Sequence, residues 1–229
     1  MSTAIARHKP NIITLSVIAA VYMWLFYSFV ILKDPSIART VYIMLLCFGG
    51  GYLISRYFKY KKSEVFEYKP HPNPIALTIG LSLLATAIMW GTTLLFRPGL
   101  FDPGTISEGL KTCGTPLKNY WLIAGAFALL NPFAEEWLWR KNVFPYLRTK
   151  MSRNWAIFVS AILFAGYHPL AIILLFPPLW LFGVFTMCFI GGIFLVGLFL
   201  KTHKMRYSVA LHMVININLI FIWFNYTAS

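Results

Sequence analysis

Two neighbouring glutamates and two histidines lie on long apolar segments of this sequence. Of the seven acidic residues only Glu135 and Glu136 fall on such a segment, and of the five histidines only His168 and His212 fall within or at the ends of one. An ionisable group in an apolar environment costs several kcal/mol unless it is paired or faces water, so these positions are candidates for a functional site. A carboxylate beside an imidazole is suited to proton transfer.

Three pairs of residues are each four positions apart, so that each pair shares one face of a helix. The pairs are Glu136 with Arg140, Phe164 with His168, and His212 with Asn216. Taken separately, each has an ordinary structural explanation: an ion pair, a packed ring, a hydrogen-bonded histidine or an amide that joins two helices. Taken together, a carboxylate, two imidazoles and an amide on three helices are what a hydrolase needs.

These groups fit the hydrolysis of an amide. Glu135 can accept a proton from water while His168 holds that water or shares the proton. His212 and Asn216 can donate hydrogen bonds to the oxyanion that develops. Glu136 lies about 100° around the helix from Glu135, so one glutamate can pair with arginine while the other faces a cavity. The sequence contains neither a GxSxG nor an HExxH motif.

The elements that must position these residues are membrane-spanning helices. The chain is 59% hydrophobic and only 12% charged, whereas a soluble domain carries about 25% charged residues. This composition excludes a soluble enzyme, a disordered chain and a disulfide-stapled secreted module. Stretches of membrane-spanning length predict seven spans in one all-α bundle, a single integral membrane domain over residues 1–229; an eighth helix between Pro169 and Pro178 is the alternative. The expected spans cover residues 11–32, roughly 40–55, 75–96, 154–168, 179–200 and 207–225, with a loop over 97–118. The fourth span begins near Asn119 and carries Glu135 and Glu136 near its end.

The basic residues predict the orientation of this bundle. With the N-terminus in the cytoplasm, 15 of the 20 Lys and Arg residues fall on the cytoplasmic side, as the positive-inside rule requires. The net charge of +13 comes from short clusters between apolar runs and not from one continuous groove. We therefore expect a multi-pass protein of the cell membrane that contacts lipid and binds no nucleic acid.

The three pairs also match the motifs of a known family. The run from Asn131 to Arg140 resembles the EExxxR motif of the CAAX protease and bacteriocin-processing (CPBP) family, also called the Abi or type II CAAX prenyl endopeptidase family. Phe164 to His168 matches its FxxxH motif, and His212 to Asn216 matches its HxxxN motif, in the same order. The resemblance covers residues 131–216, within a predicted catalytic core over 119–225, whereas residues 1–118 contribute only hydrophobicity.

The resemblance implies a glutamic-type intramembrane endopeptidase that cleaves a membrane-associated peptide or protein. It assigns water activation to Glu135 with His168, the oxyanion hole to His212 and Asn216, and supporting roles to Glu136, Arg140 and Phe164. It leaves the substrate open between a prenylated protein, a bacteriocin leader, a pheromone and a membrane-sorting tail. No cofactor is expected; zinc held by one glutamate and two histidines is the alternative.

Two other classes of function are compatible with the same residues. In a non-enzymatic immunity or scaffold protein, the polar cluster would only hold helices together. In a proton-coupled transporter, it would relay protons. The enzyme reading also sets a geometric condition, because Glu135 and His212 are expected near the cytoplasmic side and His168 near the far end of its span. The fifth helix must be short or tilted, or begin elsewhere than near Asn154.

Overall fold

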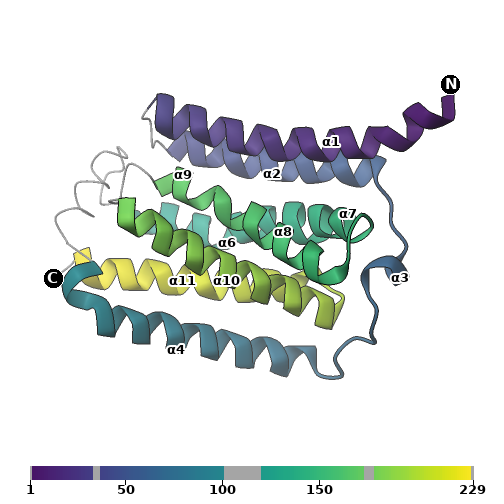
Figure 1. Cartoon of the computed structure of the whole chain (residues 1–229). Helices are drawn as coiled ribbons and strands as arrows, with labels where there is room; N and C mark the ends of the chain where they lie inside the picture. Colours follow the sequence, from purple (N-terminus) through teal and green to yellow (C-terminus); the bar gives the residue numbers. More distant parts are fainter. Residues whose placement is uncertain (1, 33–36, 101–119, 173–177, 228–229) are drawn as a thin grey trace.

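The computed structural model of the 229-residue chain describes residues 2–32, 37–100, 120–172 and 178–227. Within these ranges every regular element is a helix, which confirms the predicted all-α class. Figure 1 shows the long helices lying side by side in one bundle, with the short α3 at one end of it.

The first two helices pair along most of their length. Helix α1 (Ser2–Leu25) passes directly into a π-helical segment, η1 (Phe26–Ile31), and α2 (Ile37–Tyr57) runs beside α1 (Figure 1). Their backbones approach closely at Gly50, where a Cβ atom would overlap the side chain of Val17. Helix α1 begins before the apolar stretch expected from residue 11, because backbone hydrogen bonds continue through charged positions that a membrane span excludes.

Two further helices follow a polar connection. Helix α3 (Lys62–Val65) is a single turn, and α4 (Pro74–Leu100) is one of the longest helices of the bundle. The start of α4 is defined by Asn73, whose Oδ1 accepts the Ala76 N–H at 3.0 Å, and by a proline at its first position. Helix α4 continues a few residues beyond the expected end at residue 96; residues 101–119, most of the expected loop, lie outside the described residues.

The remaining described elements carry all the predicted site residues. They are α6 (Tyr120–Leu138), the π-helical η3 (Trp139–Val143), α7 (Phe144–Arg148), α8 (Arg153–Gly166), α9 (His168–Ile172), α10 (Pro178–Thr202) and α11 (Met205–Thr227). Helix α10 packs against α8 and α11, and α11 packs against α4 and α6 (Figure 1). With five residues, α9 is far shorter than the roughly 20 that a membrane crossing needs.

Several helices have the length and composition of membrane helices. Three candidate spans cover Pro74–Leu95, Leu181–Thr202 and Met205–Ile222, and two shorter apolar helices cover Ile12–Ser28 and Val41–Tyr57. Their outward faces are apolar as well, since on α4 Leu83 and Leu95 are 67% and 77% exposed. Helices that are apolar on all sides are typical of a membrane protein. The count of seven spans stays a prediction.

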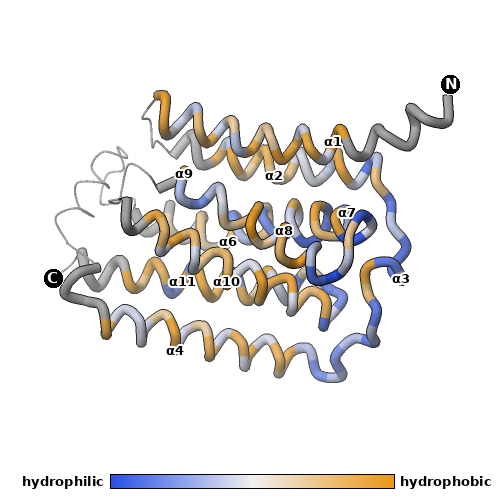
Figure 2. The backbone as a smooth tube through the Cα atoms, viewed as in Figure 1, coloured by the Kyte–Doolittle hydropathy of each residue, from blue (hydrophilic) through white to orange (hydrophobic). Residues whose placement is uncertain are grey.

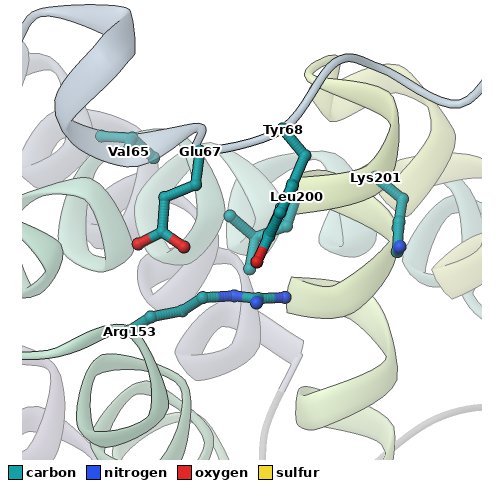
Figure 3. A pocket seen from close by; sticks show the side chains of 6 residues that line it. All are labelled: Val65, Glu67, Tyr68, Arg153, Leu200 and Lys201. Carbon is teal, nitrogen blue, oxygen red and sulfur yellow. The ribbon is translucent and has the colours of Figure 1, made fainter.

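The connections at one end of the bundle form a polar layer (Figure 2). Here Arg148 forms an ion pair with Glu67, and the Arg153 guanidinium lies 5.4 Å from the centre of the Tyr68 ring. Figure 3 shows Arg153 of α8 and Lys201 of α10 beside Glu67 and Tyr68, around a small pocket. These two contacts hold the segment that follows α3 against α7 and α8 at this end of the bundle.

Candidate active site

The end of α6 carries both glutamates, and the helix changes its hydrogen-bond pattern directly after them. Helix α6 continues through Pro132 to Leu138, and the π-helical η3 then contains Arg140. Proline removes one backbone hydrogen bond inside α6, and single π-helical turns are frequent at functional sites. Both irregularities lie within two turns of Glu135.

Glu136 and Arg140 form the predicted ion pair in the interior of the bundle. Arg140 Nη1 lies 3.2 Å from Glu136 Oε1, and both side chains are 0% exposed. Arg140 Nη2 donates to the carbonyl oxygen of Gly192 on α10 at 3.5 Å, and the guanidinium lies 4.1 Å from the centre of the Phe164 ring. The pair therefore links α6 and η3 to α8 and α10, and the Phe164 ring packs against the Arg140 guanidinium.

His212 lies between the two glutamates. Its Nδ1 is 3.0 Å from Glu136 Oε1, and its Nε2 is 3.6 Å from Glu135 Oε2. Because an ionised carboxylate only accepts hydrogen bonds, Nδ1 carries the proton of the shorter contact. The ring also packs edge-on against Phe164, with centroids 5.8 Å apart. Glu136 thus orients His212 through one ring nitrogen and leaves the other facing Glu135.

Glu135 is bonded through one carboxylate oxygen only. Its Oε1 accepts a hydrogen bond of 2.8 Å from Asn131 Nδ2, one helical turn earlier. Its Oε2 faces His212 and has no hydrogen-bond partner within the described ranges, although the side chain is only 3% exposed. Buried acceptors are nearly always paired, so this exception needs an explanation. Oε2 is the oxygen that is free to accept a proton.

His168 lies where the chain breaks between α8 and α9. Helix α8 has 14 residues, and at 1.5 Å per residue it is about 21 Å long, shorter than the roughly 30 Å of the hydrocarbon core. This short fifth helix meets the condition that the sequence set for His168. The rings of His168 and His212 both pack edge-on against Phe164, with centroids 4.8 Å and 5.8 Å from it. His168 Nδ1 donates to the Phe164 carbonyl at 2.8 Å, so Nε2 of the neutral ring is an acceptor.

The predicted residues other than Asn216 therefore lie in one cluster, from α6, η3, the α8–α9 junction and α11. Asn216 lies one turn beyond His212 on α11 and is 8% exposed. The sequence analysis gave no role to Asn131, although its spacing of four from Glu135 predicts their contact. It also gave none to Tyr167, which no spacing rule distinguishes from a packing residue.

The site contains several potential metal ligands. Within the described part of the chain, however, no group of three or more His, Cys, Asp or Glu side chains is placed to hold a metal ion. One nitrogen of each histidine is already engaged, Nδ1 of His212 by Glu136 and Nδ1 of His168 by the Phe164 carbonyl. The Nε2 atom of each ring takes part in neither of these two contacts.

The comparison with known families agrees with this geometry. Residues 117–218 match the family model described as type II CAAX prenyl endopeptidase Rce1-like. These residues are similar to that family, and we refer to residues 117–218 as the Rce1-like domain. This domain begins just before α6, ends within α11 and contains all three motifs. No curated protein and no solved structure matches the chain.

The match to the Rce1-like family model supports a protease, which is a hydrolase, as the class of this protein. It also agrees with the apolar helices in indicating a membrane protein. The match does not extend to α1–α4, which precede it. The roles of individual residues rest on the contacts described above.

Proposed function

We propose that the Rce1-like domain is an intramembrane endopeptidase that hydrolyses a peptide bond of a membrane-associated peptide or protein with water activated by Glu135. The observation that supports this function is the convergence of buried Glu135 and His212 with half-buried His168 from separate helices. Glu135 Oε2 faces His212 and has no hydrogen-bond partner within the described ranges, so it is available to accept one from water.

In the first step, a water molecule donates hydrogen bonds to Glu135 Oε2 and to His168 Nε2. This step uses the carboxylate form of Glu135 and the neutral form of His168, whose Nδ1–H is directed to the Phe164 carbonyl, so that both atoms act as acceptors. The water oxygen bonds to the carbon of the scissile carbonyl, and its proton moves to Glu135. The electron pair of the C=O double bond moves to the carbonyl oxygen, which becomes an oxyanion.

In the second step, His212 and Asn216 stabilise the oxyanion. For His212 this role requires the imidazolium form, in which Nδ1–H donates to Glu136 and Nε2–H donates to the oxyanion. When the oxyanion collapses, the C–N bond breaks and Glu135 returns the proton to the leaving nitrogen. The products are a carboxylic acid and an amine, and Glu135 is again a carboxylate.

Three residues hold this machinery in place without touching the substrate. Glu136 fixes the His212 ring, and Arg140 neutralises Glu136. Phe164 lies under Arg140 and against His212, and its carbonyl fixes His168. We propose these as supporting residues, whose loss should act on folding as well as on rate.

We propose that the protein crosses the cell membrane several times with its N-terminus in the cytoplasm. The polar layer at one end of the bundle gathers Arg148, Arg153 and Lys201, as a cytoplasmic face would. Reporter fusions after residue 70 and at the C-terminus test this orientation. The seven-span topology expects a cytoplasmic signal after residue 70 and an external one at the C-terminus. The same side for both would contradict seven spans.

We also propose that the reaction needs no metal. Dialysis of the purified protein against a strong chelator, with metal analysis of the product, should leave the cleavage rate unchanged. Loss of activity that added zinc restores would contradict a metal-free mechanism and favour zinc bound by Glu135 and the two histidines.

The cellular test compares cleaved membrane peptides in cells that carry the wild-type protein, Glu135→Ala or the control Glu64→Ala. Glu64 is exposed on α3, far in sequence from the Rce1-like domain. Cleavage products seen with wild type and Glu64→Ala should vanish with Glu135→Ala at equal protein level. An unchanged set of products would contradict the proposed function.

A further inference from the structure

Tyr167 lies at the break between α8 and α9, next to His168, and the proposed steps leave it without a role. It is the C-cap residue of α8, and His168 is the first residue of α9. The Tyr167 ring stacks on the His168 ring, with centroids 4.3 Å apart and 24° between the planes. The break between the two helices thus places a phenol directly against the imidazole of the site.

Aromatic side chains pack against the ring of Tyr167 on several sides. It stacks on Trp139 at 5.9 Å and 10°, and it meets Phe164 and Tyr22 edge-on at 5.9 Å and 6.4 Å. Tyr167 is only 3% exposed. Because aromatic neighbours surround the ring, its hydroxyl cannot swing to the surface to find a partner there.

The Tyr167 hydroxyl and one oxygen of Glu135 are complementary hydrogen-bonding groups. The hydroxyl is buried without a hydrogen-bond partner within the described part of the chain, and so is Glu135 Oε2. Phe164 connects the two groups, because its ring contacts both Tyr167 and His212, and His212 Nε2 lies 3.6 Å from Glu135 Oε2. The electrostatic effect of the Glu135 carboxylate on the Tyr167 hydroxyl agrees with this proximity. A phenol donates and a carboxylate accepts, so the two groups are complementary. Leaving both unpaired in the interior would be costly.

We propose that the Tyr167 hydroxyl donates a hydrogen bond to Glu135 Oε2 and so holds this carboxylate in the orientation that accepts a proton from water. Tyr167 is then a positioning residue that acts through Glu135. A carboxylate oxygen has two lone pairs, so Oε2 can accept from Tyr167 and from water at once. Together with Asn131 on Oε1, Tyr167 would fix both ends of the carboxylate. This inference rests on the proposed function.

The experiment compares Tyr167→Phe with Tyr22→Phe in the purified full chain. Both variants lose one hydroxyl from the same aromatic cluster, but the Tyr22 hydroxyl donates to the Leu163 carbonyl at 2.7 Å. The substrate is a fluorescence-quenched synthetic peptide that spans a cleavage site lost in Glu135→Ala cells. For each variant, kcat, KM and Tm are measured in the same detergent.

We expect Tyr167→Phe to lower kcat by about 10- to 100-fold, since a small misplacement of a catalytic group costs up to about 10²-fold. Its KM should stay within about twofold, and its Tm should fall no further than that of Tyr22→Phe, because each variant loses one hydrogen bond. Tyr22→Phe should keep kcat within about threefold of wild type, with a slightly lower Tm because the half-buried Leu163 carbonyl loses its additional donor.

Two results would overturn the role of Tyr167. One is an unchanged kcat in Tyr167→Phe, and the other is a fall in kcat that is accompanied by a marked fall in Tm and a rise in KM. If Tyr167→Phe does not fold, 3-fluorotyrosine at position 167 keeps the ring and makes the hydroxyl a stronger donor. An altered kcat then supports positioning, and an unaltered kcat contradicts it. Wild type without cleavage, or Glu135→Gln with full cleavage, would instead overturn the proposed function itself.

Discussion

The helices that precede the Rce1-like domain bury a different kind of polar group from the helices within it. In α1–α4 the polar side chains that are buried among the described residues are the hydroxyls of Thr14, Ser28, Thr78 and Thr93. Within the domain they include Glu135, Glu136, Arg140 and His212. A hydroxyl can be satisfied within its own helix, as Thr78 is by the Pro74 carbonyl at 2.7 Å. A buried charge needs a partner on another element.

This difference predicts that the two regions constrain their sequences unequally. The first helices need apolar side chains that fit, and many sequences provide them. The domain needs particular groups at particular distances across α6, α8, α10 and α11. The first helices still contribute walls to the site, because α2 packs on Trp137 at Gly51, and Tyr22 of α1 donates to the Leu163 carbonyl.

The largest effect should follow from leaving one buried charge without its partner. Arg140→Met removes the cation that neutralises Glu136, and both side chains are 0% exposed. Breaking such a pair costs about 3–5 kcal/mol. We expect a loss of this size in the free energy of unfolding in detergent. Thr14→Val in α1, as the control, should lower the free energy of unfolding by about 1 kcal/mol or less. Equal losses in the two variants would contradict the difference between the two regions.

The next effect should fall on rate and leave stability unchanged. Asn216→Ala removes a proposed oxyanion donor on α11. Loss of one such donor typically lowers kcat by about 10²–10³-fold. Steady-state kinetics and thermal unfolding of the same preparation separate the two quantities. A variant that loses stability but keeps its rate would make Asn216 a structural amide that joins helices.

A smaller effect should appear where the two regions touch. At Gly51 a Cβ atom would overlap the Trp137 ring, whereas at Gly49 it would meet no atom within 4 Å. Gly51→Ala should therefore cost about 1–3 kcal/mol of stability through overpacking. Gly49→Ala should be neutral or stabilise the helix by up to about 1 kcal/mol. Unfolding curves of the two variants that coincide would show that α2 does not pack tightly on the domain.

The smallest effect concerns the polar layer. Burial against Phe66 and the charge of Lys62 lower the pKa of His203 below its ordinary value of 6.5. The unfolded chain then binds a proton at His203 more readily than the folded chain does. The stability that the neutral His203 contributes to the fold is therefore present above pH 6.5 and is lost as the pH falls below it. Between about pH 7.5 and about pH 5, Tm should fall further in wild type than in His203→Asn.

Asparagine is suitable for that comparison because the backbone of His203 has a φ of 58°, and asparagine adopts this conformation readily. The variant therefore removes the titrating group without introducing backbone strain. Parallel declines of Tm in both proteins would assign the pH dependence to other groups of the bundle.

Much of the site could be predicted because helical spacing is a local property. The contact of Glu136 with Arg140 and the shared face of Phe164 and His168 both follow from residues four positions apart. The all-α class followed from composition, and the bounds of α10 and α11 differ by only a few residues from the predicted spans over 179–200 and 207–225.

Contacts between helices could not be predicted in the same way, because they depend on how the helices rotate and where they break. Nothing in the sequence shows that His212 lies between Glu135 and Glu136. The convergence of His168 required the end of α8 at Gly166, which periodicity does not reveal. Tyr167 was missed for the same reason, since a tyrosine in an apolar run is ordinarily a packing residue.

The decisive measurement compares purified wild-type protein with Glu135→Gln and Glu64→Gln on one synthetic peptide. Glutamine keeps the shape of Glu135 and its contact with Asn131 but cannot accept a proton from water. A lost general base lowers kcat by about 10²–10⁴-fold, so we predict a loss in this range for Glu135→Gln with an unchanged Tm, and a wild-type rate for Glu64→Gln. A folded Glu135→Gln variant that cleaves at the wild-type rate would contradict the assignment of Glu135 as the base.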